Sequence, residues 1–377
     1  MAESAGVVPT WRSSFPAMGT RIDIIGWGGN GMAIVNAVVG IVARHEDMWS
    51  VFRPSSEVSR LNDVVASTGG GGASRCGADS AQAGHGLVVS EETDRLLRDA
   101  LALAEATGGA FNPLIGPLVA AWDVKAMRAA YVAGTPLPPA PAADAVEAAL
   151  CASSWSLLSR VGERRWVMGV PGESAGGVDA PSPSLDLGGI AKGYTADACR
   201  DLAVAMGARG VLVSVGTSSV SVFGTRADGT SWRAGLRDPH GGPTSVAGIV
   251  ELPAGGMASL STSGDNLGPL GVLAPEVVVR AAGSVSDRRA RETSRETAAG
   301  GGRVFDHHII DPRTGYPANA GVRQVSVVAS SGVLAEALST ALLVDPSIDV
   351  PDVVARWARV TGAPASAKVV GLVRVGS

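Results

Sequence analysis

The chain has 377 residues, of which 46% are hydrophobic and 18% charged, with a formal net charge of −4. This length allows one large or two ordinary domains, and the charge balance gives no electrostatic basis for binding nucleic acid. We find no signal peptide or lipobox, and no run near the roughly 20 apolar residues that span a bilayer. The cysteines are far apart and form no metal or disulfide motif, which favours a cytoplasmic protein without a membrane span: Cys76, Cys151 and Cys199.

The predicted elements of the first half are one strand followed by helices. Residues 20–27 read as a strand, and residues 32–49 carry apolar side chains at the three- and four-residue spacing of a helix. Ser90 is a typical N-cap for a helix that ends at Gly108-Gly109. A further helix follows Lys192.

The second half predicts mainly strands. We expect strands at 211–215, 220–223, 232–236, 247–252 and 324–329, a turn at 261–265, a helix at 334–343 and a helix–strand pair within 353–375. Because runs of strands are interrupted by helices instead of alternating with them, the pattern favours the α+β class. The expected division is an N-terminal tail (1–14) and one domain (15–377) with surface insertions at 68–86, 134–143 and 283–302.

The stretch from Ser184 to Tyr194 places a carboxylate, a glycine pair and a lysine at the mouth of a helix. Glycines there let a ligand approach backbone amides, whose dipoles favour negative charge. Lys192 adds a cation, and Asp186 could hold a ribose or ribityl hydroxyl or help organise a metal. The pattern indicates a site for a phosphate-bearing small molecule. A tight turn with a solvated lysine explains the same residues equally well.

A second candidate is the loop from His308 to Pro317, which Asp-Pro and Gly-x-Pro make rigid. His308 is suited to proton abstraction near neutral pH. The alternative interpretation is structural, in which Asp311 caps a turn and pairs with Arg313.

A third candidate is the pair Glu336 and Thr340, four residues apart and so on one face of a helix. A carboxylate and a hydroxyl suit a hard cation such as Mg2+. Glutamate and threonine at this spacing also occur on ordinary solvated helix faces.

Taken in order, these motifs resemble those of the ApbE family, the FAD:protein FMN transferases. The resemblance covers roughly Phe15 to Val344. Further matching pieces are Met18-Gly19-Thr20, Ser56 to Asn62, Phe111-Asn112-Pro113 and Thr262-Ser263-Gly264. It implies a single two-lobed α+β domain with mixed and antiparallel sheets and packed helices, which holds FAD in a cleft between the lobes.

The resemblance also implies an activity and its residues. The reaction would be Mg2+-dependent transfer of FMN from FAD to a Thr or Ser hydroxyl of an acceptor protein that carries a flavinylation motif, with release of AMP. His308 would be the general base, and the metal ligands would be the Gly189 carbonyl and the Glu336 and Thr340 side chains. The FAD site would be lined by Met18, Phe52, Ala110, Phe111, Asn112, Asp186, Lys192, Ile310 and Ser339.

The chain departs from the family pattern at two places. Glu336 stands where relatives commonly have Asp, and its extra methylene changes the geometry around a cation that needs ligands at about 2.0–2.1 Å. The turn from Ser214 to Ser218 replaces an Asn-x-Gly-Gly-acidic turn. Two alternatives therefore stay open: an FAD-binding homologue with little transferase activity, and an FAD pyrophosphatase that gives FMN and AMP.

Overall fold

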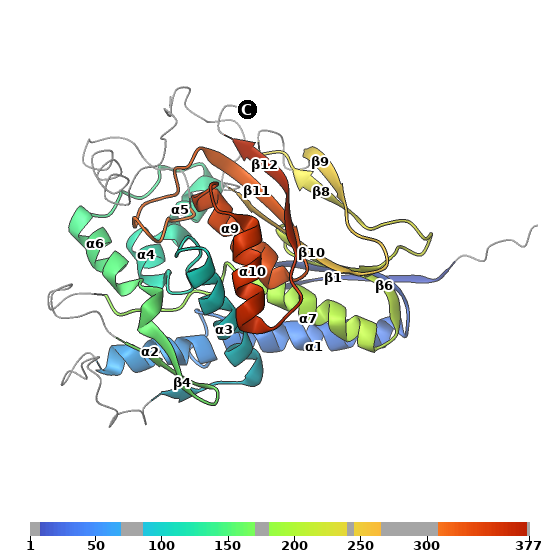
Figure 1. Ribbon diagram of the computed structural model, residues 1–377, viewed down its shortest axis with the longest axis horizontal. Coiled ribbons are helices and arrows are strands. Elements are labelled where there is room, and N and C mark those ends of the chain that lie inside the picture. The colour runs from blue at the N-terminus through green and yellow to red at the C-terminus, as the bar shows by residue number, and fades with distance from the viewer. Residues whose placement is uncertain (1–7, 69–85, 170–180, 240–244, 265–307, 375–377) are drawn as a thin grey trace, which may run out of the picture.

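The computed structural model describes residues 8–68, 86–169, 181–239, 245–264 and 308–374 (Figure 1). Its main sheet has the strand order β1-β2-β6-β7-β10-β11-β12, and every neighbouring pair is antiparallel. The strands are β1 (Thr10–Ala17), β2 (Thr20–Gly28), β6 (Ala208–Val215), β7 (Ser219–Gly224), β10 (Met257–Gly264), β11 (Val322–Ala329) and β12 (Ala367–Arg374).

Three helices cover one face of this sheet (Figure 1). α1 (Gly31–Trp49) and α7 (Ala191–Ala205) lie side by side against β2 and β6, while α9 (Gly332–Val344) crosses α7 and packs on β10 and β11. Alternate residues of β2 and β6 point into this layer, where Ile22, Ile24 and Val211 are fully buried.

The other face of the sheet is covered by the hairpin of β8 (Arg233–Arg237) and β9 (Val246–Glu251). Trp232 and Leu236 form one buried apolar cluster with Val222 and Leu260 of the main sheet. The middle of the sheet, at β7, β10 and β11, is therefore largely buried on both faces, and its helical face is where α7 and α9 meet.

A second group of elements lies beside the sheet and shares its core. Leu96 and Leu97 of α3 belong to the same buried cluster as Leu334 and Leu338 of α9. A short 3-10 turn, Trp155–Leu157, leads into β4 (Leu158–Gly162), which forms a small sheet with β5 (Arg165–Met168) and β3 (Leu87–Val88). The helices here are α2 (Glu57–Thr68), α3 (Glu91–Ala106), α4 (Gly116–Ala121), α5 (Val124–Ala133), α6 (Ala143–Ala152) and α10 (Val350–Thr361).

The α+β prediction is confirmed, and each helix and strand expected from residue 20 onward is present with bounds shifted by a few residues. Two expectations are wrong. Residues 10–14, assigned to a tail, form part of β1 and pair with β2, and the turn expected at 261–264 is the end of β10.

Most residues of the predicted insertions lie outside the part of the chain that the structure describes. The segment 283–302 and all but the ends of 68–86 lie outside the described residues, while residues 134–142 connect α5 to α6. None of the described helices combines the length and the apolar character needed to cross a membrane.

Candidate active site

The loop before α7 is fixed by hydrogen bonds from two other segments. Asp186 N donates to Pro113 O at 2.9 Å. The Asn62 side chain bonds both the amide (2.8 Å) and the carbonyl (3.2 Å) of Leu185. Within the loop, Asp186 Oδ1 accepts from Gly188 N at 2.8 Å. α2 and the segment after α3 therefore hold the carboxylate and the glycine pair in place.

Lys192, in the first turn of α7, joins this loop to α9. Its Nζ donates to Gly188 O at 2.8 Å and lies 3.4 Å from Glu336 Oε1. The ammonium thus lies between a backbone carbonyl and a carboxylate, and the Lys192 side chain is 28% exposed rather than freely solvated. We call this meeting point of the loop, Lys192 and Glu336 the cation junction.

α7 and α9 cross with their backbones in contact. A Cβ atom on Gly193 would lie 2.3 Å from Gly332 O, and one on Gly332 would lie 2.3 Å from Gly193 O. This approach lets Gly193 N donate to Glu336 Oε2 at 2.8 Å. Because the first amides of α7 have no partners within their own helix, the carboxylate of α9 satisfies one of them.

Glu336 is buried, with 3% of its surface exposed. Its second oxygen, Oε1, accepts a hydrogen bond from Ser219 Oγ of β7 and faces Lys192. Burial of a charged carboxylate requires such partners. The alternative of a solvated helix face does not hold for α9, since nearly all of its residues are buried.

One turn along α9 from Glu336, two hydroxyl groups of α9 and two of β10 form a cluster. Ser339 Oγ lies 3.1 Å from Ser261 Oγ and 2.8 Å from Ser263 Oγ, and Thr340 Oγ1 lies 3.0 Å from Ser263 Oγ. Ser339 is fully buried, so its side chain shapes the site from within rather than from its surface. Thr340 is half-buried beside it.

In the His308 loop, Asp311 has the structural role that the alternative interpretation assigns to it. Arg313 donates to Asp311 Oδ1 from its backbone N (2.9 Å) and Nε (3.1 Å), and to Asp345 at 2.8 Å. His308 begins the loop half-buried, and Ile310 is 4% exposed in an apolar cluster with α4.

The segment Ala110 to Asn112 follows α3 and is buried. Its Phe111 ring lies against the loop, since a Cβ on Gly189 would be 3.5 Å from Phe111 Cε2. Asn112 donates to Ser153 O at 2.6 Å and accepts from Leu114 N at 2.8 Å, so its amide holds backbone.

Met18 and Phe52 lie on two further loops. Met18 forms the β1–β2 turn with Gly19 and has a left-handed φ of +51°, which is unusual for a residue with a side chain and marks a position worth testing for function. Phe52 follows α1, is 75% exposed, and has Lys125 Nζ 5.3 Å from its ring centroid.

The contacts above bring Asp186, Gly189, Lys192, Phe111 and Glu336 together. No contact between described residues brings Phe52 into this group. Two further residues complete it: Asn62, which the sequence marks only as the end of a matching motif and which supports the loop, and Ser219, a partner of Glu336 that sequence reasoning missed. Ser219 directly follows the turn that departs from the family pattern.

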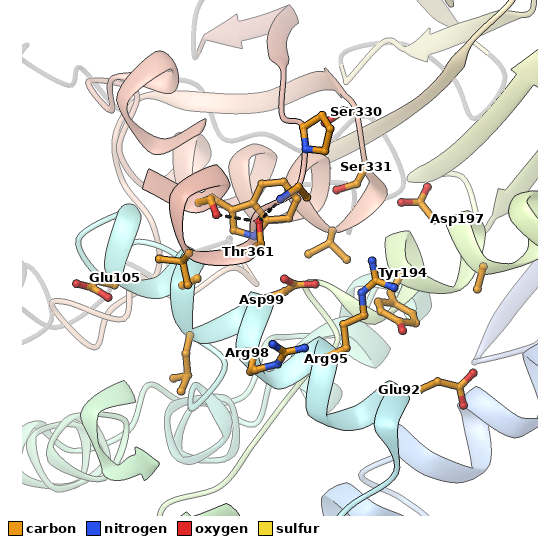
Figure 2. A pocket seen from close by; sticks show the side chains of 18 of the residues that line it. Glu92, Arg95, Arg98, Asp99, Glu105, Tyr194, Asp197, Ser330, Ser331 and Thr361 are labelled. Atoms are coloured by element: carbon orange, nitrogen blue, oxygen red, sulfur yellow. Dashed lines mark hydrogen bonds between the residues drawn. The ribbon is translucent and has the colours of Figure 1, made fainter. Parts of the chain in front are cut away.

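A cavity of about 570 Å³ lies elsewhere, between α3, α7 and α10 (Figure 2). None of the predicted site residues lines it in the described part of the chain. Arg160 and Arg200 in its wall pair with carboxylates of the protein. Asp99 points into it, and burial raises the pKa of Asp99 to about 6. This cavity is therefore separate from the cation junction, although Asp197 of α7 forms part of its wall.

Comparison with known proteins gives one family. A model described as the ApbE family matches residues 18–267 and 285–361. The FAD:protein FMN transferase of Treponema pallidum (strain Nichols) is 30% identical over 279 residues, which cover 70% of this chain and 63% of that protein. The protein of the same name from Rhodobacter capsulatus is 31% identical over 322 residues, covering 85% and 48%. The chain therefore spans less than two thirds of the length of these two relatives.

Solved structures agree with the fold. The flavin transferase ApbE from Vibrio cholerae matches with a TM-score of 0.65 and 21% identity over 98% of both chains. The ApbE protein from Thermotoga maritima matches with a TM-score of 0.65 and 24% identity over 98% of this chain and 97% of that one. At these identities the likeness concerns the fold.

Proposed function

The chain belongs to the ApbE family, and we propose that it transfers FMN from FAD to a Ser or Thr hydroxyl of an acceptor protein, releasing AMP. The observation that carries this proposal is the cation junction, where Lys192 lies between Gly188 O and Glu336 Oε1 at a helix N-terminus. Relatives named FAD:protein FMN transferase support the choice of substrate.

The oxygen donors at the junction, together with the Thr340 hydroxyl one turn further along α9, fit Mg2+, the metal that the family resemblance implies. The Gly189 carbonyl, Glu336 carboxylate and Thr340 hydroxyl are all hard oxygen donors. The loop carbonyl of Gly188 and the Glu336 carboxylate already hold one positive charge between them, the Lys192 ammonium. When bound, Mg2+ would supply charge that offsets the pyrophosphate. Among the described residues no three His, Cys, Asp or Glu gather, so we propose one carboxylate completed by backbone and hydroxyl oxygens.

The proposed chemistry divides between Lys192 and His308. Lys192 would offset negative charge on the pyrophosphate and so reduce its repulsion of an attacking oxygen. His308 would take the proton of the acceptor hydroxyl while its oxygen bonds to the FMN phosphorus. The bond from that phosphorus to the bridging oxygen breaks, and the bridging oxygen leaves with AMP. FAD would be held by Met18, Phe52, Ala110, Phe111, Asp186 and Ile310, with Asn112 and Ser339 shaping the site from within.

The test is incubation with FAD, Mg2+ and an acceptor domain that a proven family member labels. We expect flavin fluorescence on the acceptor that survives denaturing electrophoresis, and little of it with His308→Asn at neutral pH. AMP and FMN without labelled acceptor would indicate an FAD pyrophosphatase, and intact FAD a binding protein, and either result refutes transfer. Normal labelling by His308→Asn would remove this residue as the base.

A further inference from the structure

A second carboxylate, that of Asp197, lies at the crossing of α7 and α9. Its position on α7 matches the position of Glu336 on α9. Asp197 lies four residues after Gly193, and Glu336 lies four residues after Gly332. Gly332 N, the first amide of α9, donates to Asp197 Oδ2 at 2.6 Å, while Gly193 N donates to Glu336 Oε2 at 2.8 Å. Each helix therefore supplies the carboxylate that caps the N-terminal amides of the other.

The two carboxylates differ in what holds their second oxygen. Asp197 Oδ1 accepts from Ser221 of β7 (2.5 Å), Ser259 of β10 (2.6 Å) and Arg200 (2.9 Å). The corresponding oxygen of Glu336 has one serine hydroxyl and the Lys192 ammonium. Asp197 is thus tied to two strands of the sheet, whereas Glu336 faces the site. Figure 2 shows Asp197 close to Ser331, the N-cap of α9.

We propose that Asp197 is a positioning residue for Glu336 and thereby sets the affinity of the cation junction for a divalent cation. This inference rests on the proposed function, because it takes Glu336 as a cation ligand. Asp197 holds the first turn of α9, and Glu336 lies one turn further along the same helix. Since glycines put no side chains between the helices, the capping carboxylates set how α9 is turned against α7. A rotation of α9 would move the Glu336 carboxylate away from the loop.

The test measures divalent cation binding without FAD, by electron paramagnetic resonance titration with Mn2+, which takes the same oxygen ligands as Mg2+. For Asp197→Ala we expect a folded protein whose Mn2+ affinity falls roughly tenfold to hundredfold, the usual cost of removing a group that orients a metal ligand. Asp197→Asn keeps an oxygen for Gly332 N and should recover most of the affinity.

The matched control is Asp201→Ala. Asp201 lies one turn along α7 and also pairs with Arg200, at 2.8 Å, but its side chain is 53% exposed. We expect this variant to bind Mn2+ like the wild type. In a Glu336→Ala background, Asp197→Ala should cause no further loss, because Asp197 acts through Glu336.

An unchanged Mn2+ affinity in Asp197→Ala overturns the inference, as does an equal loss in Asp201→Ala or a further loss in the double variant. If Asp197→Ala does not fold, Asp197→Ser carries the same expectation, since its hydroxyl is too short to reach Gly332 N. If the wild type binds Mn2+ and Asp197→Ala loses affinity as expected, but the wild type labels no acceptor, the proposed function alone is refuted. A wild type that does not bind Mn2+ refutes both.

Discussion

Helix α7 is packed between two helices that it meets in different ways. Against α1 it buries apolar surface, with Val38 and Val42 fully buried and the Trp49 and Tyr194 rings in edge contact at 5.2 Å. Against α9 it makes backbone contact at a glycine crossing and exchanges capping hydrogen bonds. Burial is non-directional, whereas these hydrogen bonds need specific geometry. The α1 side therefore anchors α7, and the α9 side places the polar groups of the candidate site.

The largest effect on the α9 side is expected from Glu336→Ala. The variant removes the carboxylate from Lys192, Ser219 and Gly193 N, so the rate of acceptor labelling should fall more than about a hundredfold, beyond the usual cost of an outer partner. Glu336→Asp keeps the charge and draws it back by about one C–C bond, roughly 1.5 Å. It should therefore retain more activity than alanine. A labelling rate for the alanine variant within tenfold of the wild type would exclude Glu336 from the site.

The crossing itself is tested by Gly193→Ala. The new Cβ would meet Gly332 O at 2.3 Å, and backbone cannot give way as a side chain can. We expect a loss of about 3 kcal/mol in the free energy of unfolding, the upper end of typical overpacking costs. Urea unfolding measures it.

The control for this variant lies on α1. A Cβ on Gly40 meets nothing within 4 Å, so Gly40→Ala should stabilise the protein by about 0.5–1 kcal/mol through helix propensity. Two alanine variants that shift stability alike would show that the α9 crossing is no tighter than an open helix surface.

Much of the fold could be predicted because apolar side chains recur at the period of each element, as in β2 and α1. β10 was misread as a turn for a physical reason. Its residues Ser259, Ser261 and Ser263 point inward to meet the polar side of α7 and α9, so the strand lacks the apolar alternation that marks a buried face. The sequence pattern indicates neither β1 nor β3, because Ser13 interrupts the inward-facing apolar positions of β1, and the two residues of β3 are too few to show a period.

Prediction of the site was also limited to residues that a local sequence pattern marks. Lys192 and Glu336 carry charges in recognisable motifs, and the structure brings them together. Asp197 and Ser219 were missed, because their importance depends on which helix crosses which, a long-range property. A signal was present in the equal spacing of Gly193 to Asp197 and of Gly332 to Glu336. Recognising it required knowing that the two glycines touch.

The smallest effect on activity is expected on the α1 side, from His45. This residue is fully buried, with Nδ1 2.9 Å from Thr195 Oγ1 and Nε2 3.6 Å from Glu92 Oε1. Burial lowers the pKa of His45 to about 4, although the charge of Glu92 acts in the opposite direction and that of Arg44 adds to the lowering. The folded protein therefore keeps this imidazole neutral over most of the acid range.

In the unfolded chain the pKa of His45 returns to its ordinary value of 6.5. Between these values the unfolded state binds a proton that the folded state does not, so stability falls as pH falls. From pH 7.5 to pH 5 we expect a loss of about 2 kcal/mol in the free energy of unfolding. His45→Gln keeps a partner for Thr195 but does not titrate, so its urea unfolding should lack this part of the decline, and its labelling rate at pH 7.5 should match the wild type. An equal decline in both proteins would assign the acid sensitivity to other groups, whereas a lower labelling rate would show that the α1 side also positions the site.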